Sequence, residues 1–241
     1  MPAEPNWAVL RHLVLATGDA LAASARLAGE LRLPPGFGDP ELAAIGLTDR
    51  NMPVGEQKYL EVVGPLGPGS YLNRWLARVG GQGGYCLSVQ VPDVPACKQR
   101  ALDAGVRLAA DQEVLGHPIV QLHPADVGIL LELDGIADRS AWFWDDITPG
   151  PQPDALIDDI LAVTVGVPDP EAVTAQWAGI MGLEPAGPAR LDFSGCAVDF
   201  VPHPRGQVLG ATFRQPGPPG DGRPLPGDLL GLAASYAVAP Q

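Results

Sequence analysis

The stretch LRHLVLATGD, residues 10–19, contains the pattern on which the fold depends. Its apolar residues are typical of a β-strand, and the Gly-Asp pair that ends it is typical of a helix start. Two later stretches have the same form, YCLSVQVPD at 85–93 and ILAVTVGVPD at 160–169. In each of them an Asp stands where its carboxylate can accept hydrogen bonds from the free amides of a following helix.

These stretches open repeated modules, each of which reads as a strand, a helix and then about three strands. Within the first module we expect a helix over 20–31 and strands over 42–48 and 58–63. Residues 228–237 are expected to form a short helix or strand. The predicted boundaries are a first module at 7–66, a second at 82–136, a linker at 137–154, a third module at 155–214 and a Pro/Gly-rich tail at 215–241.

Composition limits the class of protein. The 241 residues are 46% hydrophobic, which is enough for a core despite 30 Gly and 27 Pro. The net charge of −13 opposes binding to nucleic acid or to anionic membranes. We find no signal-peptide pattern and no apolar run of about 18 residues. The three cysteines form no CxxC pair, so we expect a cytoplasmic protein.

Two charged or polar residues stand out on the strands of the first module. His12 lies on its first strand and Glu61 on its last, and a charged group in an apolar strand needs a partner or a metal. When the modules are aligned on the Asp at the helix start, His12 corresponds to Cys86 and Glu61 to Glu132, at separations of 49 and 46 residues. The third module has Ala162 at the first position, and we expect no ligand set there.

The order of these elements resembles that of the vicinal oxygen chelate superfamily, which includes glyoxalase I, methylmalonyl-CoA epimerase, extradiol dioxygenases and antibiotic-binding resistance proteins. The stretches that carry the resemblance are RHLVLATGD, YLEVVGPLG and VQLHPADVGILLELDG. They span residues 10–135 well, and residues 160–214 fit only as a degenerate module. The resemblance implies an α+β fold in which two βαβββ modules pair around a cleft, with the third packed beside them.

The resemblance also implies a divalent metal in the cleft, such as zinc, nickel, manganese or cobalt. Its ligands would be His12, Glu61 and Glu132, with Cys86 at the fourth position. Cys86 departs from the family pattern, because relatives that bind metal usually have His, Gln or Glu there. A thiolate can ligate zinc, but a buried neutral cysteine is also a common core residue. The alternatives for the others are a hydrogen-bonded core imidazole and carboxylates that pair with Arg or with water.

For function, the resemblance implies a metal-dependent enzyme of the lyase or epimerase type that acts on a small oxygenated metabolite. Glu132 or Glu61 would then be the catalytic base. The alternative is a metal-free protein that binds or sequesters a small molecule, as bleomycin-resistance proteins do. Because such modules work in pairs, the unpaired third module favours a homodimer. The aromatic cluster Trp142, Phe143 and Trp144 is expected to pack the linker against a module, and His117, His123 and His203 are expected to lie outside the site.

Overall fold

The computed structural model describes residues 6–148, 152–217 and 225–238. Its residues divide into two compact units, each made of three segments. Unit 1 comprises Met1–Arg11, Cys86–Asp145 and Ala162–Val208, and unit 2 comprises His12–Tyr85, Asp146–Leu161 and Leu209–Gln241. Both units combine helices with strands, which confirms the predicted α+β class. Within the described residues, no helix is long and apolar enough to cross a membrane.

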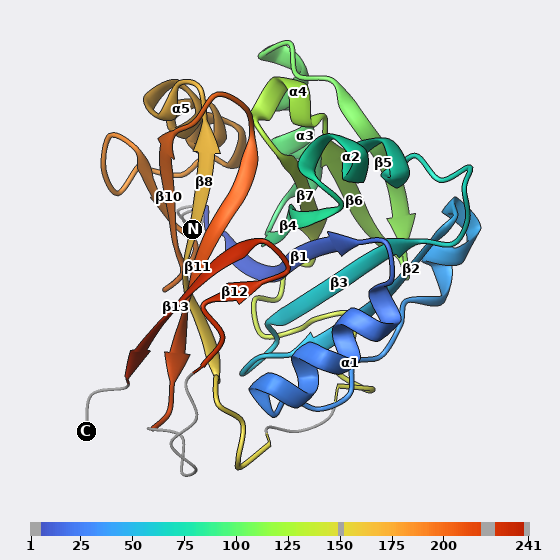
Figure 1. Cartoon of the computed structure of the whole chain (residues 1–241). Helices are drawn as coiled ribbons and strands as arrows, with labels where there is room; N and C mark the ends of the chain where they lie inside the picture. Colours follow the sequence, from blue (N-terminus) through green and yellow to red (C-terminus); the bar gives the residue numbers. More distant parts are fainter. Residues whose placement is uncertain (1–5, 149–151, 218–224, 239–241) are drawn as a thin grey trace. The chain divides into compact units, whose positions relative to one another are not determined.

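Unit 2 begins inside the first strand of the chain. Its strand β3 pairs with β1 in parallel and with β2 in antiparallel orientation, and α1 packs across β2 and β3 (Figure 1). The same unit contains a parallel pair of β11 with β13. The elements are β1 (Val9–Thr17, in unit 2 from His12), α1 (Ala20–Leu31), the 3-10 helix η1 (Pro40–Ile45), β2 (Leu47–Pro53), β3 (Tyr59–Pro65), α2 (Leu72–Val79), β12 (Asp228–Leu229) and β13 (Leu232–Val238).

Unit 1 holds the two later repeats of the pattern. In the first of them β7 pairs with β4 in parallel and with β6 in antiparallel orientation. In the second, β10 pairs with β8 in parallel and with β9 in antiparallel orientation. The elements are β4 (Gln82–Val91), α3 (Val94–Asp103), β5 (Leu108–Val114), β6 (His117–Leu122), α4 (Pro124–Val127), β7 (Leu130–Gly135), β8 (Asp159–Val167), α5 (Pro170–Met181), β9 (Arg190–Asp192), β10 (Ala197–Pro202) and β11 (Gln207–Gln215). Strands β1, β4, β8 and β11 each have residues in both units.

The helix starts predicted from the repeated Asp are confirmed at α1, α3 and α5. In each case the Asp precedes the first helical residue and its Oδ1 accepts a hydrogen bond from the backbone amide three residues later. This caps a donor that would otherwise lack a partner inside the helix. The bonds are Asp19 to Ala22 at 3.0 Å, Asp93 to Ala96 at 2.9 Å and Asp169 to Ala172 at 3.0 Å.

The first module differs from the prediction between residues 40 and 53. The stretch expected as a strand at 42–48 begins instead as the 3-10 helix η1, with Asp39 as its cap and Pro40 at its first position. Gly46 ends this helix in the left-handed conformation, and the strand starts only at Leu47. The apolar pattern was misleading because Ile45 is 54% exposed and does not enter the core. Helix α2 was not predicted, whereas β13 lies in the stretch expected as a helix or strand.

A buried arginine orders the segment after β7 in unit 1. The Arg11 side chain is 3% exposed, its Nε donates to Gln90 Oε1 at 2.7 Å, and its Nη2 donates to the Arg139 carbonyl at 2.8 Å. Gln90 Nε2 in turn donates to the Ile136 carbonyl at 2.8 Å. The Arg11 guanidinium also lies 5.2 Å from the centre of the buried Trp142 ring. The linker is therefore packed through Trp142, as predicted.

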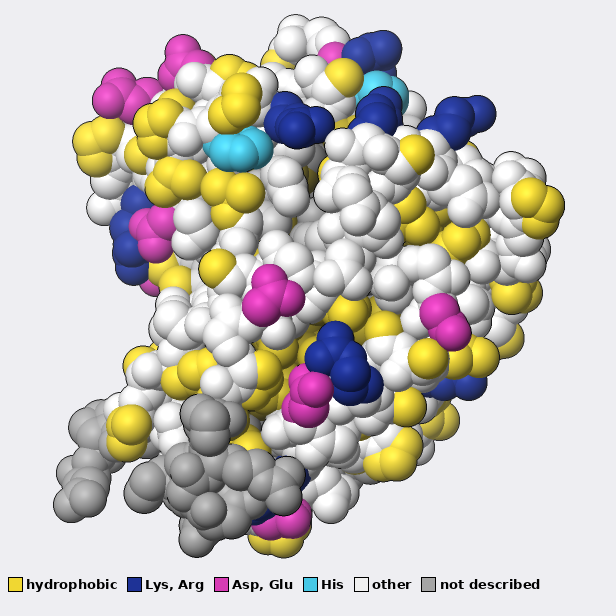
Figure 2. Space-filling model, in the orientation of Figure 1, with side chains coloured by type: hydrophobic (Ala, Val, Ile, Leu, Met, Phe, Trp, Pro, Cys, Tyr) yellow, Lys and Arg dark blue, Asp and Glu magenta, His cyan; other side chains and the backbone are white. Residues whose placement is uncertain are grey.

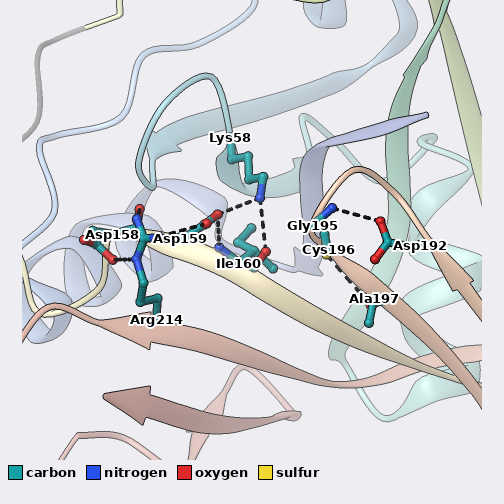
Figure 3. Close-up of polar contacts among 9 residues, drawn as sticks. All are labelled: Lys58, Asp158, Asp159, Ile160, Asp192, Gly195, Cys196, Ala197 and Arg214. Atoms are coloured by element: carbon teal, nitrogen blue, oxygen red, sulfur yellow. Dashed lines mark hydrogen bonds and ion pairs between the residues drawn. The ribbon is translucent and has the colours of Figure 1, made fainter. Parts of the chain in front are cut away.

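In unit 2 a group of ion pairs joins three strand ends (Figure 3). Lys58 Nζ donates to Asp159 Oδ1 at 2.6 Å and to the Ile160 carbonyl at 3.2 Å. Arg214 Nε donates to Asp158 Oδ1 at 2.7 Å. These bonds connect the residues just before β3 with the start of β8 and the end of β11, so segments far apart in sequence are tied together.

One tight approach in unit 1 gives a test of the packing. A β-carbon added to Gly206 would lie 1.5 Å from the carbonyl oxygen of Gly128, whereas one added to Gly179 in α5 would meet no atom within 4 Å. We expect Gly206→Ala to lower the free energy of unfolding by about 1–3 kcal/mol, because the backbone must move. Gly179→Ala should raise it by about 0.5–1 kcal/mol. Urea denaturation of both variants measures this, and equal stabilities would contradict the close approach.

Candidate functional site

The structure brings His12 and Glu61 together in unit 2. Adjacent parallel strands carry them, because His12 on β1 is in register with Tyr59 on β3 and Val14 is in register with Glu61. His12 Nδ1 and Glu61 Oε2 are 2.7 Å apart, and the His12 residue is 7% exposed. This is a short, largely buried hydrogen bond between an imidazole and a carboxyl group. The structure therefore brings these two predicted site residues into direct contact.

Two more buried polar residues, Asp49 and Asn51 on β2, lie beside this pair. Asn51 is in register with Glu61, and Asp49 lies two residues away on the same face of the strand. Each is 1% exposed. Asp49 accepts hydrogen bonds from Asn51 Nδ2 at 2.5 Å and from the Asp39 backbone amide at 2.9 Å. Sequence reasoning missed both residues, although the TDRN stretch contains two polar side chains at period 2.

Burial and like charge raise the proton affinity of both carboxyl groups. The pKa of Glu61 rises to about 8, mainly because burial disfavours the charged form and secondly because Asp39 is near. The pKa of Asp49 rises to about 7, first through burial and then through the charge of Glu61. The hydrogen bonds from Asp39 and Asn51 act in the opposite direction on Asp49. Two carboxyl groups that titrate near neutral pH are suited to proton transfer.

Aromatic rings close one side of the cluster. The Tyr59 ring lies 4.9 Å from the His12 ring, centre to centre, and 5.9 Å from the Phe37 ring. Tyr59 is fully buried, and its hydroxyl is 2.6 Å from Thr148 Oγ1. These rings lower the local polarity around His12, which agrees with the effect of burial on the neighbouring carboxyl groups.

The other two predicted ligands, Cys86 and Glu132, lie in unit 1 and repeat the same register. Ser88 on β4 is in register with Glu132 on β7, and Cys86 lies two residues before Ser88. In the same way, Val14 is in register with Glu61, and His12 lies two residues before Val14. Cys86 is 5% exposed, and its Sγ donates to the Leu87 carbonyl at 3.4 Å. Glu132 accepts a hydrogen bond from Gln121 Nε2 at 2.6 Å.

The third module has an acidic residue at the position equivalent to Glu61 but no ligand residue at the position equivalent to His12. Thr164 on β8 is in register with Asp199 on β10, and Ala162 is the counterpart of His12. Asp199 is 2.6 Å from Arg190, and this ion pair is exposed. The equivalent of Glu61 is thus Asp199. The separations of 49 and 46 residues in the first two modules would place it at 208–211, but the last strand of the third module follows its first strand after fewer residues. Without a histidine opposite it, Asp199 forms a surface ion pair.

The remaining histidines have structural partners. His123 caps α4 by accepting from the Ala125 amide at 3.2 Å, His117 Nδ1 lies 3.3 Å from the Gly135 carbonyl, and His203 Nδ1 lies 2.6 Å from the Arg205 carbonyl. His117 also packs against Phe143, with the ring centres 5.5 Å apart. These contacts give each of the three histidines, which were expected to lie outside the site, a partner in a turn or in side-chain packing.

The donors of the His12–Glu61 pair fit a divalent metal by their chemistry. Imidazole nitrogen and carboxylate oxygen are ligands that zinc, manganese, nickel and cobalt all accept. His12 Nε2 is buried on the ring edge away from Glu61, and Glu61 has a second oxygen. Among the residues that the structure describes, no group of three or more His, Cys, Asp and Glu side chains is arranged around one point. The pair would therefore supply part of a ligand set.

A repeated strand–helix–strand module, with matched first-strand and last-strand positions, is the arrangement that the resemblance to the vicinal oxygen chelate superfamily implies. An ethylmalonyl-CoA/methylmalonyl-CoA epimerase from Cereibacter sphaeroides is 29% identical to this chain over 136 residues, which are 53% of this chain and 97% of that protein. A search of protein-family models gave no match.

The solved structures found by comparison include two methylmalonyl-CoA epimerases. One, in complex with methylmalonyl-CoA and NH4+, is 22% identical with a TM-score of 0.48 and covers 55% of this chain and 96% of its own. The other, from Mycobacterium tuberculosis, is 24% identical with a TM-score of 0.47 and covers 54% of this chain and 89% of its own. These similarities concern about half of the chain.

The raised pKa values predict that the metal-free protein becomes less stable as the pH rises. Unfolded carboxyl groups titrate near pH ~4, whereas folded Asp49 titrates at about 7 and Glu61 at about 8. The folded state binds more protons between these values, so the contribution of these two groups to the free energy of unfolding is fully present below about pH 4 and is lost as the pH rises to about 8. Asp49→Asn should remove part of this fall, as measured by urea denaturation at pH 5, 7 and 9 with a chelator.

Asp126→Asn is the matched control. Arg107 lowers the pKa of Asp126 to about 2 through hydrogen bonds, so this group stays charged throughout pH 5–9. Its replacement should shift stability without changing the slope against pH. An Asp49→Asn slope equal to that of the parent would contradict the assigned proton affinity.

Proposed function

We propose that the protein is an epimerase-type enzyme that removes and returns the proton on the carbon next to a carbonyl group, acting on an acyl-CoA thioester with a second carboxyl group. The observation that carries the proposal is the buried His12–Glu61 pair with Asp49 beside it. The name of the Cereibacter sphaeroides relative supports the substrate class, since its CoA thioesters are 2-substituted malonyl esters.

Asp49 is the best-placed group in unit 2 to take the proton. It is buried, its pKa of about 7 matches a base that works at neutral pH, and Asn51 and the Asp39 amide hold its two oxygens in fixed directions. The electron pair left on carbon moves toward the carbonyl oxygen. Return of a proton to the opposite side of that carbon completes the inversion, and the role of Glu132 as a base stays a prediction from the sequence.

We propose that His12 and Glu61 would hold a divalent metal, whereas the ligand roles predicted for Glu132 and Cys86 of unit 1 stay predictions. When bound, the ion supplies Lewis-acid stabilisation of the oxygen on which negative charge develops. Glu61 then serves as a ligand, which leaves Asp49 as the free carboxylate beside it. Zinc, nickel, manganese and cobalt are the candidate ions for this site, since all of them accept imidazole and carboxylate ligands.

The alternative predicted from the sequence, a metal-free binding or sequestration protein, gains no support from the described residues. A protein that only binds a ligand has no need for two carboxyl groups that titrate near neutral pH, because their desolvation costs stability without aiding recognition. A protein that binds these thioesters tightly and does not exchange their proton would nevertheless favour this alternative.

We expect the protein to catalyse exchange of the α-proton of methylmalonyl-CoA or ethylmalonyl-CoA with deuterium from solvent, as followed by proton NMR. Asp49→Asn should lower the exchange rate by about 10²–10⁴-fold, the range for loss of a general base. Asp126→Asn, which alters a half-buried carboxylate of unit 1 that pairs with Arg107, should leave the rate within twofold. Absence of exchange with both thioesters in folded, metal-supplemented protein would refute the proposed activity.

Metal binding is tested separately from activity. We expect elemental analysis of dialysed protein to give close to one divalent ion per chain, and His12→Ala to reduce this at least tenfold. His117→Ala is the control, because it removes a histidine that packs against Phe143 and should leave the metal content unchanged. A parent protein without metal, after incubation with each of the four ions, would rule out the metal site.

A further inference from the structure

A surface groove runs along helix α1 in unit 2. It has a volume of about 510 Å³, and one side is formed by α1 while the other is formed by the segment after the helix and by β2. This volume falls within the range of small-molecule sites, about 300–1,000 Å³. The lining includes Leu21, Ala25, Ala28, Gly29, Leu33 and Arg50.

The groove exists because α1 has small residues on this side. Ala25, Ala28 and Gly29 carry little or no side chain, and a β-carbon added to Gly29 would meet no atom within 4 Å. On the opposite wall Gly36 is held against β2, where a β-carbon would lie 3.0 Å from the Arg50 Cβ. Leu21, at the edge of the groove, is 48% exposed. The apolar walls are therefore fixed by packing and remain open to a ligand.

Arg50 is the one charged residue in the lining. Its Nη1 donates to the Asp49 carbonyl at 2.7 Å, and within the described residues it forms no ion pair with a carboxylate. Two other basic residues of unit 2 are paired, Arg26 with Glu30 and Lys58 with Asp159. In a chain with 28 acidic and 15 basic residues, a cation that remains available in an apolar groove favours an anionic ligand.

The groove is separate from the His12–Glu61 cluster. Asp49 and Arg50 are consecutive on β2, so their side chains point to opposite faces of the sheet. Helix α1 packs on the face to which Arg50 points (Figure 1). Where α1 lies, the surface in Figure 2 is mostly hydrophobic or uncharged and shows one adjoining basic and acidic pair. A ligand of low charge is therefore suited to this face.

We propose that this groove binds an aliphatic carboxylate, with its carboxylate on the Arg50 guanidinium and its chain along the small residues of α1. A single cation balances a single negative charge, and the planar guanidinium matches a carboxylate. The apolar walls bury the aliphatic chain, which supplies the hydrophobic part of the affinity. This site is independent of the proposed epimerase activity, and its failure would leave that activity untouched.

The test uses the full chain and decanoate below its micelle concentration, with calorimetry for binding and thermal unfolding for stabilisation. We expect decanoate to bind at one site and to raise the unfolding temperature, and decanol and butyrate to bind at least tenfold more weakly. Arg50→Gln should weaken decanoate binding at least tenfold. Arg26→Gln, which removes a basic residue of α1 that is already paired with Glu30, should bind as the parent does.

A second variant tests the place of the chain. Gly29→Leu puts a side chain into the open groove without a backbone clash and should abolish binding, whereas Gly29→Ala should largely retain it. Folding of both is checked by circular dichroism. Decanoate binding that is equal in the parent, Arg50→Gln and Gly29→Leu, or absent from the parent, would overturn the proposal. Tighter binding of decyl phosphate, lost with Arg50→Gln, would overturn the carboxylate as ligand class.

Discussion

The parallel pairing of the first and last strands of each module is the constraint on which the rest of the structure depends. A parallel pair cannot be closed by a tight turn, so each module needs a helix as crossover, and the capping Asp fixes where that helix begins. The same pairing sets the register. Glu61 and Glu132 are each paired with the residue that lies two positions after His12 and Cys86, respectively, on the neighbouring strand. Repetition of the register carries one geometry into all three modules, whatever side chains occupy it.

What the sequence predicts well is local or repeated. Helix starts follow from Asp at a strand end, and the His12–Glu61 contact follows from the module pattern. Asp49 and Asn51 were missed because they follow the strand expected at 42–48, and only pairing with β3 makes them part of a strand whose alternate side chains face Glu61. The same pairing shifts the strand expected at 42–48 to Leu47–Pro53. Such effects depend on contacts between segments, which spacing along the chain does not specify.

Buried ionisable side chains have different surroundings in the two units. In unit 1 the buried Arg11 is satisfied by an amide side chain, a carbonyl and an aromatic ring, which hold the linker in place. In unit 2 buried carboxyl groups lie close to one another and keep raised proton affinities. The first arrangement stabilises a single conformation, whereas the second holds free energy that proton or metal binding can release.

Strand β2 contributes a side chain to each of the two candidate sites, so both sites depend on its register. Consecutive side chains alternate between faces, so a shift of β2 by one residue would exchange the positions of Asp49 and Arg50. The bridge between Phe37 and Asn51 and the close approach of Gly36 oppose such a shift. The length of the segment between α1 and β2 is therefore under two constraints at once: an insertion there would disturb the chemistry of one face and the recognition surface of the other together.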